Sequence, residues 1–447
     1  MSLEDRPSIP LSHYGRSSVE PSPVGRMMAS FAADFRDGVD INLGVGYVNE
    51  ETIPRELILD AMEHVLTERE DHRVALNYGG PAGSPNLVRS LKSYIRRFGV
   101  GGLSEDHLDK FRIIIGASGA TSLLEAVSQV LPRGIVVTSD PHYYIFANYL
   151  RRFGYRILAI PEDHDGIRVD LLGEKLASLS QADRQAVSFF YLVTIGNPTS
   201  SILSNERRRE LLRVANAFSA DVGHTVPILM DRAYEDLIHD PGVPPTESAL
   251  IYEDSDCVFE IGTLSKVLAP ALRIGYMIGR DGDFLRAIVQ RVSDTGFSAP
   301  LITQEIASHM LDHHVAGQIK NVNQTYREKA GKVGAALREE LGPYLEDVIG
   351  GRAGFYYYLT FRDIRTDEGS PFYRFLSRTT GEESVDGPAD NPHPRVVYLP
   401  GSFSVSADGD MVEKGRRQLR ISYAFEETTH IIQSVKHMRH AAEYAAP

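Results

Sequence analysis

Cysteine is nearly absent from this 447-residue chain, which contains a single one, Cys257. One cysteine excludes an intramolecular disulfide and fits a reducing compartment. Because Cys257 lies in an apolar run typical of a core strand, we expect a buried and inert thiol. Cysteine and histidine do not cluster at the spacing of a structural zinc site, so we expect no metal.

Long hydrophobic runs are also missing, and no segment is apolar enough to span a bilayer. The first residues, Met1–Arg6, lack the basic-then-apolar order of a signal peptide. The formal net charge is −13, and lysine and arginine form no stripe that would bind nucleic acid. We therefore expect a cytoplasmic protein that binds neither membranes nor nucleic acid.

The length and the pattern of the chain favour two domains after a short arm. Residues 1–40 mix Pro, Ser and Gly with one helical patch, and we expect an arm that packs on the rest of the molecule or on a partner subunit. Repeated strand–helix units then predict an α/β large domain over residues 41–300. Residues 301–447 predict a smaller α+β domain, to which the arm contributes.

The segment 262–275 carries the most specific chemistry of the chain. Lys266 directly follows the apolar strand and lies among Leu, Val, Ala and Pro, so its ammonium form is poorly hydrated. Desolvation lowers the pKa of a lysine, and the neutral amine is the form that makes a Schiff base. Thr263 and Ser265 offer hydroxyls, and Arg273 offers a planar cation suited to phosphate. An amine, hydroxyls and an arginine together indicate pyridoxal 5′-phosphate (PLP), which is both an aldehyde and a phosphate.

Two further segments fit this cofactor. Residues 116–121 form a glycine-rich turn between a predicted strand and a predicted helix, an arrangement that presents free N–H groups to an anion. Asp231 ends the apolar strand 226–231, where a carboxylate is costly to bury unless a cation meets it. The protonated ring nitrogen of PLP is such a cation, and Asp231 would keep the ring an electron sink.

These segments resemble the signatures of the aminotransferase class I/II family of fold-type I PLP enzymes. The closest resemblance is to the group of kynurenine/2-aminoadipate aminotransferases and the enzyme-like domain of MocR regulators. The arm is too short for the DNA-binding domain of such a regulator. The resemblance implies a mainly parallel seven-stranded sheet, a smaller α+β domain and a homodimer with shared active sites.

The resemblance also implies the roles of individual residues. For the cofactor, Gly119, Ala120 and Thr121 are the implied phosphate donors, Tyr143 lies flat on the ring, and Asn197 and Tyr234 share the ring oxygen. Lys266, Asp231 and Tyr143 are the implied catalytic residues. Tyr78 is expected to reach the phosphate of the other subunit. Arg420 is expected to pair with the substrate carboxylate, with Asn197, Gly46 and Tyr47 also at the substrate.

The chain departs from the family pattern in three places. Tyr47 stands where relatives usually have proline, and Tyr144 replaces the second proline of the motif around Tyr143. The polar segment 362–393 is longer than the usual family connection, and it either caps the site or decorates the surface. The tyrosine run 356–358 is interpreted as a sheet face.

The sequence therefore predicts an aminotransferase that moves an amino group from an L-amino acid to a 2-oxo acid. Two alternatives remain open at this point. The same residues would serve a PLP-dependent lyase, cyclase or decarboxylating enzyme. They would also serve a module that senses an amino acid without turnover.

Overall fold

The computed structural model describes residues 9–68, 72 and 74–446. Met1–Arg6, on which the signal-peptide argument rests, lie outside these residues. The helices are α1 (His13–Ser17), α2 (Pro23–Ala33), α3 (Arg55–Thr67), α4 (Pro85–Phe98), α5 (Glu105–Lys110), α6 (Gly119–Val130), α7 (Tyr144–Phe153), α8 (Val169–Ser178), α9 (Gln181–Gln185), α10 (Asn205–Val222), α11 (Asp283–Gly296), α12 (Leu301–His313), α13 (Val315–Ala336), α14 (Pro371–Ser377), α15 (Glu383–Asp386), α16 (Val412–Gly415) and α17 (Thr428–Ala445). In this described part of the chain, no helix combines the length and the apolarity needed to cross a membrane.

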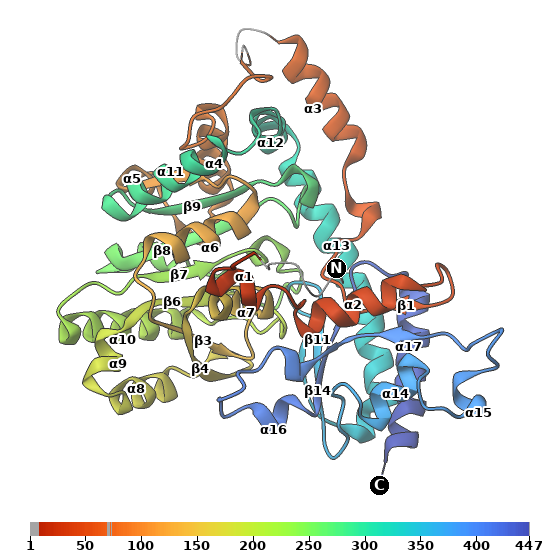
Figure 1. The fold of residues 1–447 in the computed structure, drawn as a ribbon. Helices are drawn as coiled ribbons and strands as arrows, with labels where there is room; N and C mark the ends of the chain where they lie inside the picture. The colour runs from red at the N-terminus through yellow and green to blue at the C-terminus, as the bar shows by residue number, and fades with distance from the viewer. Residues whose placement is uncertain (1–8, 69–71, 73, 447) are drawn as a thin grey trace.

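A large mixed sheet with helices on both faces organises the first two thirds of the chain (Figure 1). Its strands are β2 (Phe111–Ile115), β3 (Ile135–Asp140), β4 (Arg156–Asp163), β5 (Gly166–Ile167), β6 (Val187–Val193), β7 (Ile228–Asp231), β8 (Val258–Thr263) and β9 (Gly275–Arg280). They lie in the order β2-β9-β8-β7-β6-β3-β4-β5. The run β4-β3-β6-β7-β8 is parallel, while β9 is antiparallel to both its neighbours. This confirms the predicted α/β fold, to which β5 adds a two-residue edge strand.

Burial explains why these segments are strands. β7 and β8 are buried along their whole length, as expected for central parallel strands covered on both faces. Because parallel strands end at the same edge, the loops after β6, β7 and β8 meet at one place. Asp231 is the last residue of β7, and the loops after β6 and β8 carry Asn197 and Lys266, so the sheet itself brings the predicted site residues together.

A second sheet has the order β10-β11-β14-β13, built from β10 (Leu345–Gly350), β11 (Tyr356–Phe361), β13 (Leu399–Pro400) and β14 (Gln418–Ser422). The predicted helical region 302–341 is two helices, α12 and α13, followed by one wider turn over Leu337–Leu341. The polar segment 362–393 contains α14 and α15, and α14 packs on the C-terminal helix α17. In the described structure none of its residues lines the cavity at Lys266.

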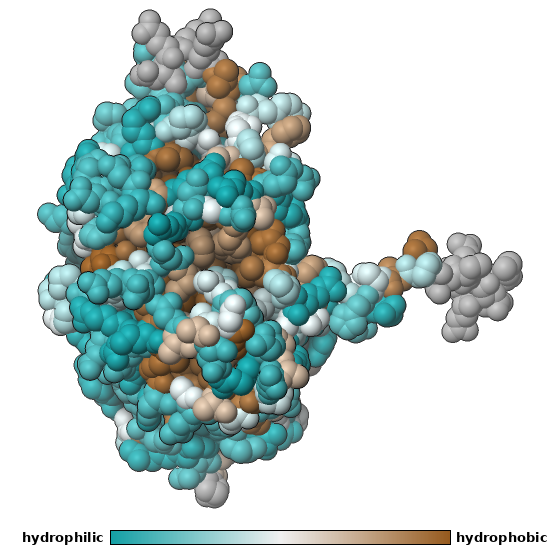
Figure 2. Space-filling view, turned by 90° about the vertical axis from the view of Figure 1, so that its left-hand side faces the viewer, coloured by the Kyte–Doolittle hydropathy of each residue, from teal (hydrophilic) through white to brown (hydrophobic). Residues whose placement is uncertain are grey.

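The N-terminal arm packs on the second sheet region. Val24, Met27 and Phe31 of α2 bury their side chains against Val397 and Leu399. The short strand β1 (Ile41–Asn42) pairs with β12 (Val396–Val397). The segment that leads into α1 projects from the body, as Figure 2 shows.

Candidate active site

A cavity of about 140 Å³ opens where the central strands end. Ten of the predicted site residues line it: Ala120, Thr121, Tyr143, Asn197, Asp231, Tyr234, Thr263, Ser265, Lys266 and Arg273. These residues come from six separate segments of the chain, and the parallel strands and the turn at the start of α6 position them.

The turn before α6 forms an anion-binding end of the cavity. Gly119 has φ +66°, a conformation that favours glycine, and its N–H donates to the carbonyl oxygen of Arg273 at 2.7 Å. A Cβ at Gly275 would lie 2.2 Å from the backbone nitrogen of Ala120, so only glycine permits this close approach. The first N–H groups of α6 have no acceptor within the helix, and they face the same space as the Arg273 guanidinium.

Hydroxyls complete this end. Thr263 donates to the carbonyl oxygen of Ile274 at 2.7 Å and lies 3.0 Å from the Ser265 hydroxyl. Arg273 donates to the backbone oxygen of Ser118 at 3.1 Å. Free N–H groups, a hydroxyl pair and a guanidinium form a donor set that fits a phosphate.

Asp231 lies buried at another wall of the cavity. Its two oxygens accept hydrogen bonds from the Tyr191 hydroxyl at 2.8 Å and from the Ala233 N–H at 3.0 Å. Burial raises the pKa of Asp231, while the hydrogen bonds and the charge of Lys266 oppose that rise. A carboxylate held this way is stabilised by any further proton donor that enters the cavity, and a protonated pyridine nitrogen is one.

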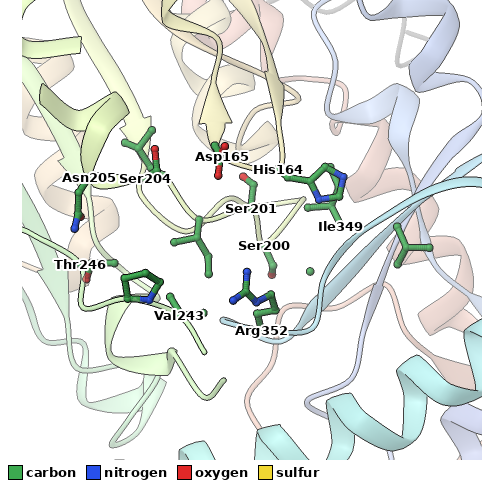
Figure 3. A pocket seen from close by; sticks show the side chains of 15 residues that line it. His164, Asp165, Ser200, Ser201, Ser204, Asn205, Val243, Thr246, Ile349 and Arg352 are labelled. Atoms are coloured by element: carbon green, nitrogen blue, oxygen red, sulfur yellow. The ribbon is translucent and has the colours of Figure 1, made fainter. Parts of the chain in front are cut away.

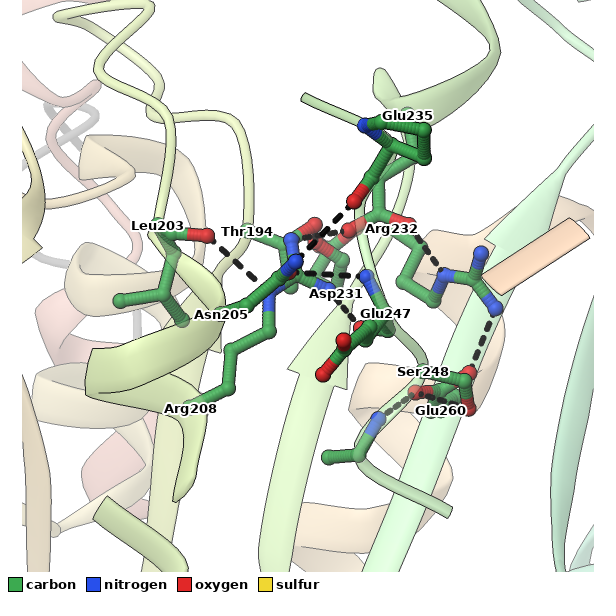
Figure 4. Close-up of polar contacts among 12 residues, drawn as sticks. Thr194, Leu203, Asn205, Arg208, Asp231, Arg232, Glu235, Glu247, Ser248 and Glu260 are labelled. Atoms are coloured by element: carbon green, nitrogen blue, oxygen red, sulfur yellow. Dashed lines mark hydrogen bonds and ion pairs between the residues drawn. The ribbon is translucent and has the colours of Figure 1, made fainter. Parts of the chain in front are cut away.

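A chain of buried ion pairs fixes the backbone turn that follows Asp231 (Figure 4). Arg232 pairs with Glu235 at 2.7 Å and with Glu260 at 2.5 Å, and Arg208 pairs with the other oxygen of Glu235 at 2.5 Å. All four side chains are buried. The chain therefore ties β7, β8 and α10 together directly behind the candidate site.

The amine of Lys266 lies beside the backbone at Gly46. It donates to the carbonyl oxygen of Gly46 at 3.4 Å. Burial and the positive charges of Arg420 and Arg273 lower the pKa of Lys266 to about 8, although Asp231 opposes them. A substantial fraction of this amine is thus neutral near physiological pH, as a nucleophile or base requires.

Arg420 reaches the site from β14 of the second sheet. It is 1% exposed, and it donates to the side-chain oxygen of Asn197 at 2.8 Å and to the carbonyl oxygen of Gly44 at 2.6 Å. Its Nε has no partner within the described structure. A buried guanidinium with spare donor capacity fits a carboxylate ligand.

Two of the predicted residues lie outside this cluster. Tyr78 is 79% exposed, and its ring packs on Phe297 with the centroids 5.2 Å apart. Tyr47 is 61% exposed and contacts Phe425 edge to face. Within one chain, neither lines the cavity.

Two residues that sequence reasoning missed also belong to the site. Tyr191 on β6 holds Asp231, and a tyrosine inside a buried strand was the available signal, because a buried phenol needs a partner. Tyr356 was interpreted as part of a sheet face. It does lie on β11, but its hydroxyl is 3.2 Å from that of Tyr234 and its ring lies under Arg420, so it also belongs to the site.

A larger cavity, of about 420 Å³, lies between loop 200–205 and the end of β10 (Figure 3). Its ionisable lining residues are His164, Asp165 and Arg352, and Arg352 donates to Asp240 at 2.7 Å. No lysine is among its described lining residues. Chemistry rather than size therefore identifies the cavity at Lys266 as the candidate active site.

Known proteins resemble this chain over most of its length. The family described as aminotransferase class I and II matches residues 39–370. The uncharacterized HTH-type transcriptional regulator YdfD of Bacillus subtilis is 26% identical over 67% of this chain, and the match spans 58% of that regulator's length. Aromatic-amino-acid aminotransferase 1 of Thermococcus litoralis is 27% identical over 67% of this chain and 68% of its own.

Solved structures share the fold over nearly the whole chain. The multiple substrate aminotransferase from Thermococcus profundus superposes with a TM-score of 0.80 at 22% identity, covering 97% of each chain. The family match, which covers most of the chain, confirms the expected family. The protein belongs to the aminotransferase class I and II family.

Proposed function

We propose that this protein transfers an amino group from an L-amino acid to a 2-oxo acid in the cavity at Lys266. The observation that carries the proposal is the position of the Lys266 amine. It lies in one buried cavity with Asp231 and Arg273, next to the guanidinium of Arg420.

The residues of the cavity fit the cofactor. The N–H groups at the start of α6, with Ser265 and Arg273, would hold the phosphate, because free donors and a cation suit an anion. Thr263 would support Ser265. Tyr143 would lie against the face of the ring, where an aromatic side chain offers stacking.

Three side chains would set the electronic state of the ring. Asn197 and Tyr234, whose polar atoms are 3.4 Å apart, would both bind the ring oxygen. Asp231 would keep the ring nitrogen protonated. PLP, when bound, supplies an aldehyde that bonds to amines and a ring that accepts electrons from the substrate Cα.

The chain's own groups would then bind the amino acid and move its proton. Arg420 and Asn197 would bind the α-carboxylate, which orients the Cα toward Lys266. The neutral Lys266 amine would remove the proton from that Cα and return it to the neighbouring carbon of the cofactor, as a general base and acid. Gly46 would border the substrate through its carbonyl oxygen.

We also propose a homodimer, in which Tyr78 would serve the phosphate site of the partner. Exposed apolar residues support a partner surface, including Leu76 at 80% and Phe297 at 55% exposure. The exposed side chain of Tyr47 would be buried either by the partner subunit or by the bound substrate. The single buried cysteine, Cys257, supports a cytoplasmic location.

The test is an absorbance spectrum of the PLP-loaded protein, recorded while amino acids are added one at a time. An amino acid that removes the visible band, and an oxo acid that restores it, would support transamination. Release of ammonia or carbon dioxide would assign a lyase or decarboxylase instead. Binding of an amino acid with no product would assign a sensor. Lys266→Ala must abolish turnover, and full activity in that variant would refute the mechanism.

A further inference from the structure

Four side chains form a closed ring of contacts around the inner wall of the site. Arg420 donates to Asn197 at 2.8 Å, and Asn197 donates to the Tyr234 hydroxyl at 3.4 Å. The hydroxyls of Tyr234 and Tyr356 are 3.2 Å apart. The ring closes where the guanidinium carbon of Arg420 lies 4.2 Å from the ring centroid of Tyr356. Three members have roles in the proposed function, and Tyr356 has none.

The surroundings of Tyr356 fix both ends of its side chain. It begins β11, it is 1% exposed, and its backbone pairs with Ser422, two residues beyond Arg420. A Cβ at Gly46 would lie 2.7 Å from the Tyr356 hydroxyl oxygen, so the hydroxyl lies directly against the backbone at Gly46. Phe355 packs on the same ring with centroids 4.8 Å apart.

The ring and the hydroxyl of Tyr356 act on different partners. The negative face of an aromatic ring attracts a cation, so the ring stabilises Arg420 in place even without a carboxylate ligand. Burial raises the pKa of Tyr356, so its hydroxyl stays neutral and keeps a proton to donate. If that proton goes to the Tyr234 oxygen, the proton of Tyr234 is free to point at the ring oxygen of the cofactor.

We infer that Tyr356 is a positioning residue that couples the two halves of the site: its ring holds Arg420 for the substrate carboxylate, and its hydroxyl orients Tyr234 toward the cofactor. This inference rests on the proposed function, which assigns Arg420 and Tyr234 their ligands. It goes beyond that function because no contact of Tyr356 with substrate or cofactor is required.

The experiment separates the two effects with two variants of the PLP-loaded protein. Tyr356→Phe keeps the ring and loses the hydroxyl. Without the Tyr356 hydroxyl, Tyr234 donates less well to the ring oxygen of the cofactor and stabilises the ionised form of that oxygen less. The pH midpoint of the visible absorbance band should therefore rise by about 0.5. Binding of propanoate, a carboxylate without an amino group, should change less than about twofold. Tyr356→Leu loses the ring as well, and propanoate binding should weaken about tenfold.

Tyr358→Phe is the matched control. Tyr358 is two residues along β11 and equally buried, but its hydroxyl donates to Gln418 at 3.3 Å. The control should leave the midpoint and propanoate binding unchanged. Equal midpoints in the wild type, Tyr356→Phe and Tyr358→Phe would overturn the inference, as would unchanged propanoate binding in Tyr356→Leu. If Tyr356→Leu does not fold, Tyr356→Phe still decides. Failure of the proposed function looks different, because the wild type would then release ammonia or carbon dioxide, bind an amino acid without forming product, or show no spectral change with any amino acid.

Discussion

The hydroxyl of Tyr191 donates to the carboxylate of Asp231 at 2.8 Å, and both side chains are buried at the cofactor cavity. Asp231→Asn keeps the shape but loses the charge for the ring nitrogen. A charge-assisted hydrogen bond contributes about 1.5–3 kcal/mol, so the single-turnover rate with an amino donor should fall about 100-fold. Tyr191→Phe removes one of the two donors to that carboxylate but keeps its charge for the ring nitrogen, and it should cost about fivefold. Stopped-flow absorbance measures both rates, and equal losses would contradict the ranking.

The lowered pKa of Lys266 predicts how the protein takes up PLP. The neutral amine becomes abundant as the pH rises through about 8, so covalent loading of the cofactor-free protein should accelerate up to that pH and then level off. Arg420→Gln removes a neighbouring positive charge, which should raise the pKa of Lys266 and move the midpoint upward. Loading rates measured by absorbance between about pH 6 and pH 10 test this, since a free lysine has a pKa of about 10.4. An unchanged midpoint in the variant would show that Arg420 does not set the pKa.

The same low pKa gives a stability prediction with a definite sign. The unfolded chain holds a proton on Lys266 up to the ordinary lysine pKa of 10.5, while the folded chain releases it near 8. Between these values the unfolded state binds more protons, so this lysine makes the cofactor-free protein more stable as the pH rises. The free energy of unfolding of Lys266→Met should lack this rise. Urea denaturation of both proteins at several pH values in that window measures the difference.

The sequence predicts the site residues that lie at the ends of apolar strands or within family motifs. Lys266, Asp231 and Asn197 each follow an apolar run, and parallel strands with buried faces bring such ends together. Arg420 was also recognised, because its strand carries a family pattern. The division at residues 40 and 300 stays a prediction, as do the roles of the individual site residues.

What the sequence could not supply are contacts between elements far apart in the chain. The Arg208–Glu235 pair joins residues 27 positions apart, and Tyr234 meets Tyr356 across 122 positions. A tyrosine on a strand points to one face or the other, and the face depends on register, which composition does not encode. The sequence also does not predict β10, because this strand is mostly half-buried and lacks an apolar run.

The close approach at the phosphate end predicts that Gly275 tolerates no side chain. A Cβ there would lie 2.2 Å from Ala120 N and 2.3 Å from Gly119 C, and backbone atoms cannot move aside as a flexible side chain could. Gly275→Ala should lower the melting temperature and weaken PLP binding at least about tenfold, since overpacking costs about 1–3 kcal/mol. Gly296→Ala on α11 is the control, because nothing lies within 4 Å of its Cβ position. Wild-type PLP affinity in Gly275→Ala would show that the turn is free to shift.

The buried ion chain behind the site predicts an acid-sensitive contribution to stability. Burial alone would raise the pKa of Glu235, but the charges of Arg208 and Arg232 outweigh it and hold the pKa at about 2. In the unfolded chain the pKa of this carboxyl returns to its ordinary value of 4.5. The stabilisation from Glu235 is therefore complete above about pH 4.5 and is lost as the pH falls toward about 2.

Glu235→Gln should show this directly. Removing one partner leaves a buried arginine short of its counter-charge, which costs about 3–5 kcal/mol at neutral pH. The exposed pair Arg416–Glu413 offers a matched control, and Glu413→Gln should change stability by less than about 1 kcal/mol. Urea denaturation at neutral pH and at successively lower pH measures the two differences. The gap between the wild type and Glu235→Gln should narrow below about pH 4.5 while the control stays flat, and a gap that does not depend on pH would mean that Glu235 acts by its shape rather than by its charge.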